Sequence, residues 1–146
     1  MRTISENDSC YCTINDSTEL EKIRGFVIDY SKRFGFDDGL SYKIALAVDE
    51  VCSNLIKHAF RNDKTKEIHI SVRIANFKTL EIIIQDDADP FDPLNTKSPD
   101  MIEYFKNFKK GGLGIHIMKL IMDEIQYIPK NNVNKWNTLI LKKHLS

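Results

Sequence analysis

A predicted helix that ends near Phe60 carries one polar ridge on an otherwise apolar surface, and this combination constrains the fold most. Glu50, Asn54 and His58 follow one another at four-residue steps. Each step turns about 40° around a helix axis, so the three side chains line one edge. Most of the other positions are apolar, namely Ile44, Ala45, Leu46, Val48, Val51, Cys52, Leu55, Ile56 and Ala59. Such a ridge faces either a binding site or a satisfied polar network, and the ridge alone favours neither.

The composition is that of one ordinary globular domain, residues 1–146. With 42% apolar and 29% charged residues, the chain can bury a core. Its 21 basic and 21 acidic side chains balance, so no global field draws it to nucleic acid or to an anionic membrane. Three cysteines without CxxC spacing favour a reducing compartment over disulfides or a zinc site. No apolar run approaches the roughly 20 residues of a membrane span, so we expect a soluble, unprocessed cytoplasmic protein.

The periodicity of apolar residues predicts alternating strands and helices. Residues 16–18 offer an N-cap for the first helix, and Asp37 to Ser41 start the ridge-bearing helix. The expected strands are residues 10–15, 67–75, 79–85, 125–129 and 135–143, and the expected helices are residues 19–35, 37–60 and 115–122. These elements predict an α/β (α+β) two-layer sandwich. Its mixed, mainly antiparallel sheet is covered on one face by about three helices.

An acidic cluster follows the third of the expected strands. Asp86, Asp87, Asp89 and Asp92 stand at and beyond the end of the strand at residues 79–85. A carboxylate there can accept a hydrogen bond from an exocyclic amine, such as that of adenine. A solvated turn shaped by prolines explains the cluster equally well.

A glycine-rich segment, residues 111–114, precedes the last expected helix. Its free backbone N–H groups and the helix dipole favour a phosphate. Three glycines can also serve only a tight turn. The long connection before it, about residues 93–111, is predicted to be a lid, and residues 101–108 are predicted to form a helical turn or two.

Together, the three motifs resemble the N, G1 and G2 boxes of the gyrase, chaperone and histidine-kinase ATPase superfamily, which shares the Bergerat ATP-binding fold. The matching stretches are Glu50-x3-Asn54-x3-His58-Ala59, Asp86-Asp87-Ala88-Asp89-Pro90-Phe91-Asp92-Pro93 and Gly111-Gly112-Leu113-Gly114-Ile115. The chain most resembles the bacterial anti-sigma factor serine/threonine-protein kinases, and residues 122–127 support this likeness. The resemblance covers residues 11–141.

The resemblance implies ATP and Mg²⁺ as cofactors and assigns residues to them. Asn54 matches the magnesium ligand, and Glu50 matches the glutamate that acts as general base or positions water near the γ-phosphate. Asp86 matches the aspartate that accepts the adenine amine, with Asp87 as the alternative. The phosphates would lie against Gly111, Gly112, Leu113 and Gly114 beneath the lid. His58 matches a histidine common in this branch, for which packing or a supporting hydrogen bond is the expected role.

Ala88 departs from the G1 pattern, which normally reads Asp-x-Gly. If this position needs a positive φ, the extra Cβ costs about 1–2 kcal/mol. That cost would weaken nucleotide binding by roughly 5- to 30-fold. The departure therefore bears on nucleotide binding and phosphotransfer, and not on the fold.

Three functions are consistent with these residues. The first is an ATP-dependent kinase that phosphorylates an anti-anti-sigma (STAS-type) antagonist, sequesters a sigma factor, or does both. The second is a nucleotide-binding but catalytically weak regulatory module. The third is a detached kinase core of a two-component-like system, since none of the four histidines lies on the amino-terminal helix. We expect protein partners and ATP/ADP, no direct nucleic acid or membrane contact, and a homodimer by resemblance alone.

Overall fold

The computed structural model describes residues 9–14, 17–56, 67–87 and 113–145 as one sheet with helices packed on it. The strands are β1 (Ser9–Ile14), β2 (Ile68–Ala75), β3 (Thr79–Asp86), β4 (Glu124–Ile128) and β5 (Asn137–His144). A short turn η1 (Ser17–Glu19) leads into helix α1 (Leu20–Phe34), followed by α2 (Asp38–Asn54) and α4 (Leu113–Ile121).

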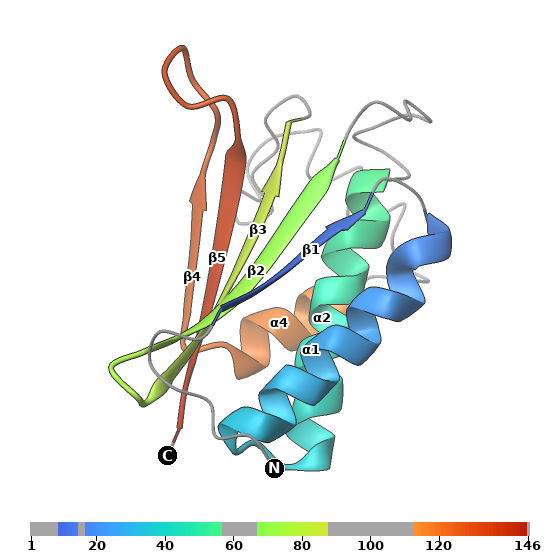
Figure 1. The fold of residues 1–146 in the computed structure, drawn as a ribbon, viewed down its shortest axis with the longest axis vertical. Helices are drawn as coiled ribbons and strands as arrows, with labels where there is room; N and C mark the ends of the chain where they lie inside the picture. Colours follow the sequence, from blue (N-terminus) through green and yellow to red (C-terminus); the bar gives the residue numbers. More distant parts are fainter. Residues whose placement is uncertain (1–8, 15–16, 57–66, 88–112, 146) are drawn as a thin grey trace.

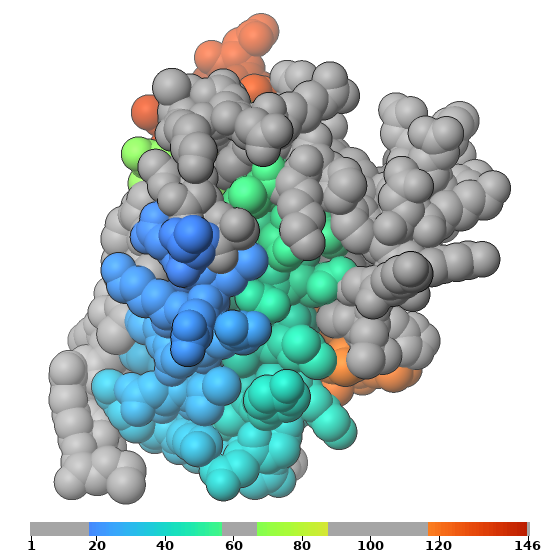
Figure 2. All heavy atoms as spheres, turned by 90° about the vertical axis from the view of Figure 1, so that its right-hand side faces the viewer, coloured from blue at the N-terminus to red at the C-terminus, as the bar shows by residue number. Residues whose placement is uncertain are grey.

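The sheet has five strands in the order β1-β2-β3-β5-β4, and all four pairings are antiparallel. Helices α1, α2 and α4 lie against one face of it (Figure 1). On the helical side, α1 and α2 run next to each other and α4 emerges beyond α2 (Figure 2), in agreement with the packing of α2 against both. The expected two-layer sandwich with a mainly antiparallel sheet is confirmed, and no parallel pairing joins the described strands.

The core lies between these two layers and follows from alternation along the strands. Alternate residues of β2 and β3 point to the same face of the sheet. The sheet contributes Ile68, Ile70, Val72, Ile74, Leu80, Ile82, Ile84, Leu139 and Leu141, all buried, and the helices contribute Ile23, Val27, Tyr30, Ile44, Ala45, Val48, Val51, Cys52 and Met118. None of the helices in the described ranges is long and apolar enough to cross a membrane.

The helix boundaries agree with most of the sequence signals. Asp37 caps α2, because its Oδ1 accepts a hydrogen bond from the Leu40 N–H at 2.7 Å. Gly35 ends α1 with φ 128°, and its N–H donates to the Ser31 and Lys32 carbonyls. The expected N-cap at residues 16–18 does not start α1 directly. The chain enters α1 through η1, so Glu19 already has helical dihedrals and makes no side-chain cap bond.

Helix α2 and the connection after β3 run into residues that the structure does not describe. Leu55 and Ile56 continue α2 as a wider helical turn. The expected helix end near Phe60, the lid at residues 93–111 and the helical turn at residues 101–108 all lie outside the described residues.

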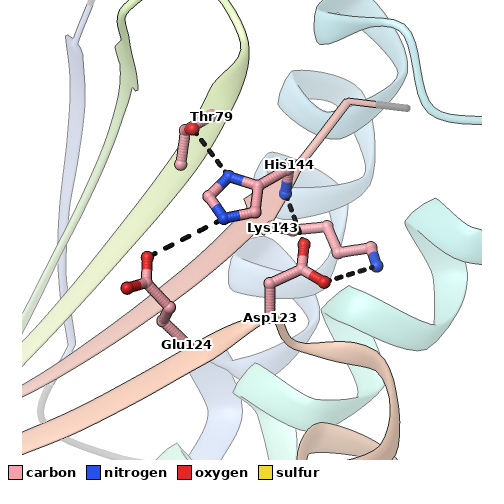
Figure 3. A network of polar contacts seen from close by, with 5 residues as sticks. All are labelled: Thr79, Asp123, Glu124, Lys143 and His144. Carbon is pink, nitrogen blue, oxygen red and sulfur yellow. Dashed lines mark hydrogen bonds and ion pairs between the residues drawn. The ribbon is translucent and has the colours of Figure 1, made fainter.

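A polar network fixes the end of β5 between β3 and β4 (Figure 3). The Asp123 carboxylate, just before β4, accepts from the His144 backbone N–H at 2.6 Å and lies 3.4 Å from Lys143 Nζ. The His144 ring contacts Thr79 Oγ1 of β3 at 2.8 Å and Glu124 Oε2 of β4 at 3.8 Å. The His144 N–H, and secondarily Lys143, hold the pKa of Asp123 below the usual aspartate range.

The Asp123→Asn substitution should therefore lower the free energy of unfolding at neutral pH. Because the folded pKa is depressed, this stabilisation exists above the unfolded pKa and disappears as pH falls through the folded pKa. Solvent exposure limits the expected loss to about 0.5–1 kcal/mol. Urea unfolding should show that the variant is less stable than wild type at pH 7 and that this difference is smaller at pH 3.

Asp29→Asn is the matched control, since Asp29 pairs with Arg33 on the exposed surface of α1 at 3.3 Å. Its expected change is at most about 0.5 kcal/mol. No loss of stability in the Asp123 variant at pH 7 would show that the network in Figure 3 does not stabilise the sheet.

Candidate functional site

The structure describes five of the nine residues that the sequence assigned to a site. Glu50 and Asn54 lie on α2, Asp86 ends β3, and Leu113 and Gly114 begin α4. The remaining four, His58, Ala88, Gly111 and Gly112, lie outside the described residues.

Asn54 is the last residue of α2 and is almost completely buried, with 3% of its surface exposed. Its Nδ2 has no hydrogen-bond partner among the described residues. An unsatisfied buried polar group costs about 1–3 kcal/mol. A ligand that accepts a hydrogen bond from this carboxamide would recover that cost.

Glu50 lies one turn before Asn54 and is partly buried. It therefore combines a position next to Asn54 on the helix with access to solvent. The neighbouring Asp49 carboxylate is held on the α1 side, where its Oδ2 lies 3.9 Å from Arg24 Nη1. The carboxylate of Glu50 and the carboxamide of Asn54 thus form the described part of the predicted ridge.

Asp86 is a buried carboxylate on the helical side of the sheet. It shares a face with Leu80, Ile82 and Ile84 and is 5% exposed. Its Oδ1 accepts a hydrogen bond from Asn137 Nδ2 at 3.0 Å. The Asn137 Oδ1 in turn accepts from the Lys130 backbone N–H at 2.9 Å.

These groups gather at one end of the interface between sheet and helices. The carboxyl ends of α2 and β3 point to the same end of the molecule (Figure 1), and α4 packs against α2. The helical layer thus supplies Asn54 and the sheet supplies Asp86, both buried. A carboxamide and a carboxylate in such a position can bind a ligand that offers hydrogen-bond donors at one end and anionic oxygens at the other.

The opposite face of the sheet carries an aromatic contact at the same end. The rings of His69 and Trp136 meet edge to face at 4.6 Å between centroids, and Lys135 Nζ lies 5.1 Å from the Trp136 centroid. Burial lowers the pKa of His69, the charge of Asp87 opposes this shift, and Lys135 adds to it. Glu67 lies 3.1 Å from Nε2, but its half-exposed carboxylate is screened by water and does not reverse the direction.

The sequence interpretation missed Asn137 and Lys130. Asn137 occupies the face of β5 that also carries Leu139 and Leu141, so a polar residue at a core-facing position was the available signal. No feature of the sequence pointed to Lys130, because its contacts are made by a backbone N–H and by a side chain whose Nζ donates to the Asp87 carbonyl at 3.1 Å. Within the described ranges, no group of three or more His, Cys, Asp or Glu side chains is arranged to hold a metal ion.

Comparison with known proteins agrees with this arrangement. A family model described as the histidine kinase-like ATPase domain matches residues 14–143. A protein named serine-protein kinase RsbW from Bacillus subtilis (strain 168) is 30% identical over 122 residues, which cover 80% of this chain and 72% of the relative. A protein of the same name from Bacillus licheniformis is 37% identical over 99 residues, covering 64% and 59%. The serine/threonine-protein kinase BtrW of Bordetella bronchiseptica is 27% identical over 105 residues, covering 72% and 71%.

The lowered pKa of His69 predicts a pH-dependent signal from Trp136, which is the only tryptophan in the chain. Protonation of His69 places a cation against the indole ring, so tryptophan emission should change with a midpoint below about 6.5. Because burial depresses this pKa, the unfolded chain binds the proton more readily, and stability should fall as pH drops through the folded pKa.

The His69→Gln substitution should remove the emission change between pH 7.5 and 5. His144→Gln is the matched control, since His144 lies at the other end of β5 and contacts Thr79 and Glu124 instead. A titration that disappears in the His144 variant and persists in the His69 variant would refute this assignment.

Proposed function

The chain belongs to the histidine kinase-like ATPase domain family, and from this we propose that it binds ATP with Mg²⁺ and acts as an anti-sigma regulatory kinase. Its substrate would be a serine or threonine of an anti-anti-sigma (STAS-type) antagonist, and it would also sequester a sigma factor. The observation that carries the proposal is the burial of one polar group in each layer, Asn54 at the end of α2 and Asp86 at the end of β3. The names of the relatives as serine-protein kinases support the reaction class.

Nucleotide binding would use both layers. Asp86 would accept the adenine amine, since a carboxylate is an acceptor and the amine a donor. The phosphates would lie toward Asn54 and the start of α4, where the N–H groups of a helix N-terminus favour anions. Gly111, Gly112 and Gly114, with Leu113, would let the backbone approach the phosphates, and residues 93–111 would cover them.

Asn54 fits a magnesium site through its chemistry. A carboxamide oxygen suits a hard cation. The Nδ2 group, which has no partner among the described residues, could donate to a phosphate oxygen beside that cation. A single protein ligand is sufficient, because Mg²⁺ in such sites takes its other ligands from phosphate and water. Bound Mg²⁺ would supply charge neutralisation on the triphosphate. The carboxamide would place that charge at the end of α2.

Glu50 would act on the acceptor hydroxyl. It lies one turn before Asn54 and retains solvent contact, so an incoming serine can approach it. As the serine oxygen bonds to the γ-phosphorus and the bond to ADP breaks, Glu50 would take the hydroxyl proton. His58 would support the ridge by packing or a hydrogen bond.

The alternative is a regulatory module in which nucleotide sets the shape offered to a partner without turnover. Ala88, at the position of the G1 glycine, favours it, since a methyl group there would weaken nucleotide binding. Transfer of radiolabelled γ-phosphate to a partner separates the two functions. An acid-labile product would instead identify a histidine acceptor and a detached histidine kinase core.

The partners that we propose are proteins. A balanced net charge supports the absence of direct nucleic acid and membrane contact. Location in the cytoplasm and assembly as a homodimer are part of the same proposal, and both rest on the family relationship.

The Glu50→Gln substitution should abolish transfer while sparing ATP binding. Loss of a general base typically costs about 100-fold or more in rate. Phosphorylation of the STAS-type antagonist should fall by that factor, and the Kd for Mg-ATP should change by less than about 3-fold, equivalent to under 1 kcal/mol.

Glu21→Gln, on the exposed surface of α1, is the matched control and should leave both quantities unchanged. Wild-type transfer rates in the Glu50 variant would remove Glu50 from the base role. Transfer that never occurs with wild-type protein, despite tight ATP binding, would favour the regulatory module.

A further inference from the structure

We propose that Asn137 and Lys130 form a positioning relay that orients Asp86 toward the base of the nucleotide. The relay would make the β4–β5 connection, residues 129–136, part of base recognition. This inference rests on the proposed nucleotide binding and adds two positioning residues to it.

The first contact of the relay lies in the sheet. Asn137, the first residue of β5, stands directly opposite Asp86 in the β3–β5 register and is 1% exposed. Its Nδ2 donates to Asp86 Oδ1 at 3.0 Å. A carboxylate that is 5% exposed depends on such donors, and a bond to one oxygen restricts the rotation of the group. Asn137 therefore restricts the direction in which the Asp86 carboxylate faces.

The second contact determines the orientation of the Asn137 amide. The Lys130 backbone N–H donates to Asn137 Oδ1 at 2.9 Å, so this end of the amide is the oxygen and the end that faces Asp86 is the nitrogen. With the amide reversed, the nitrogen would meet an N–H donor and the oxygen would meet a carboxylate. The network thus permits only the orientation that donates to Asp86.

The third contact joins the same lysine to the end of β3. Lys130 Nζ donates to the Asp87 carbonyl at 3.1 Å, immediately after Asp86. Lys130 therefore holds the backbone beyond Asp86 with its side chain and holds the partner of Asp86 with its backbone. Both contacts originate just after β4, in the connection to β5.

This arrangement favours a base with an amino donor. An ionised carboxylate only accepts hydrogen bonds, and adenine presents an exocyclic amine where guanine presents a carbonyl oxygen. A carboxylate whose orientation is fixed should discriminate between these two bases, and a carboxylate that rotates should discriminate less well. Asn137 and Lys130 are thus expected to affect recognition of the amine more than binding of the phosphates.

Calorimetric titration with ATP and with purine riboside triphosphate, which lacks the amine, tests the relay. Wild-type protein should bind ATP at least about 10-fold more tightly than the analogue, as expected for a hydrogen bond to a charged group. Asn137→Ala should reduce ATP affinity about 10-fold and leave analogue affinity within about 3-fold. Lys130→Ala, which keeps the backbone N–H, should also lower the ratio of ATP affinity to analogue affinity, but by a smaller factor.

Asn134→Ala is the matched control in the same connection, because the Asn134 carboxamide accepts from the Trp136 backbone N–H within the connection itself. Its ATP-to-analogue ratio should equal that of wild type. Circular dichroism and thermal melts establish that each variant is folded. If Asn137→Ala does not fold, Lys130→Ala carries the test.

An unchanged ATP-to-analogue ratio in the folded variants would overturn the relay, as would equal losses for both nucleotides. If wild-type protein binds both triphosphates equally, nucleotide binding stands and the relay fails. If wild-type protein binds neither, the proposed function fails and the relay with it.

Discussion

The burial of polar groups at one end of the core is the constraint on which the rest of this structure depends. Three side chains, Asn54, Asp86 and Asn137, are each at least nine-tenths buried where the apolar layers end. Removing such groups from water costs several kcal/mol unless partners replace the lost hydrogen bonds. Asp86 and Asn137 satisfy each other in part, and Asn54 keeps an unsatisfied Nδ2 among the described residues. A ligand that brings donors and anionic oxygens completes this end of the core.

The apolar part of the sheet places these groups. Ile84 pairs with Leu139, and two residues further along the same register pairs Asp86 with Asn137. A slip of one residue would turn Asn137 to the opposite face of the sheet and leave Asp86 without this donor. At the other end of the same strands, Asp123, Thr79 and His144 hold β5 in register. Stability at one end and recognition at the other thus depend on one strand alignment.

Local signals in the sequence predicted much of this fold. Alternation of apolar and polar residues predicted strands β2 and β3, whose connecting turn has positive φ at Asn76 and Phe77. Asp37 and Gly35 marked the start of α2 and the end of α1 through their capping chemistry. The polar ridge identified Glu50 and Asn54 because helical spacing is local. Asn137 also had a local signal, as a polar residue at a core-facing strand position, but its contact with Asp86 could not be predicted this way. Asp86 lies 51 residues earlier, and only the β3–β5 register brings the two together. The entry of α1 through η1, where a helical turn replaces the expected cap, could not be predicted this way either.

The central claim is that the buried Asn54 carboxamide completes a Mg-ATP site, and calorimetric titration of wild type and Asn54→Ala with ATP tests it most directly. With Mg²⁺, wild-type protein should bind one ATP per chain, and EDTA should weaken that affinity by at least about 10-fold, or about 1.4 kcal/mol. The Asn54 variant should bind ATP weakly and equally with Mg²⁺ or EDTA. No binding by wild type, or a magnesium dependence that survives in the folded variant, would contradict the account.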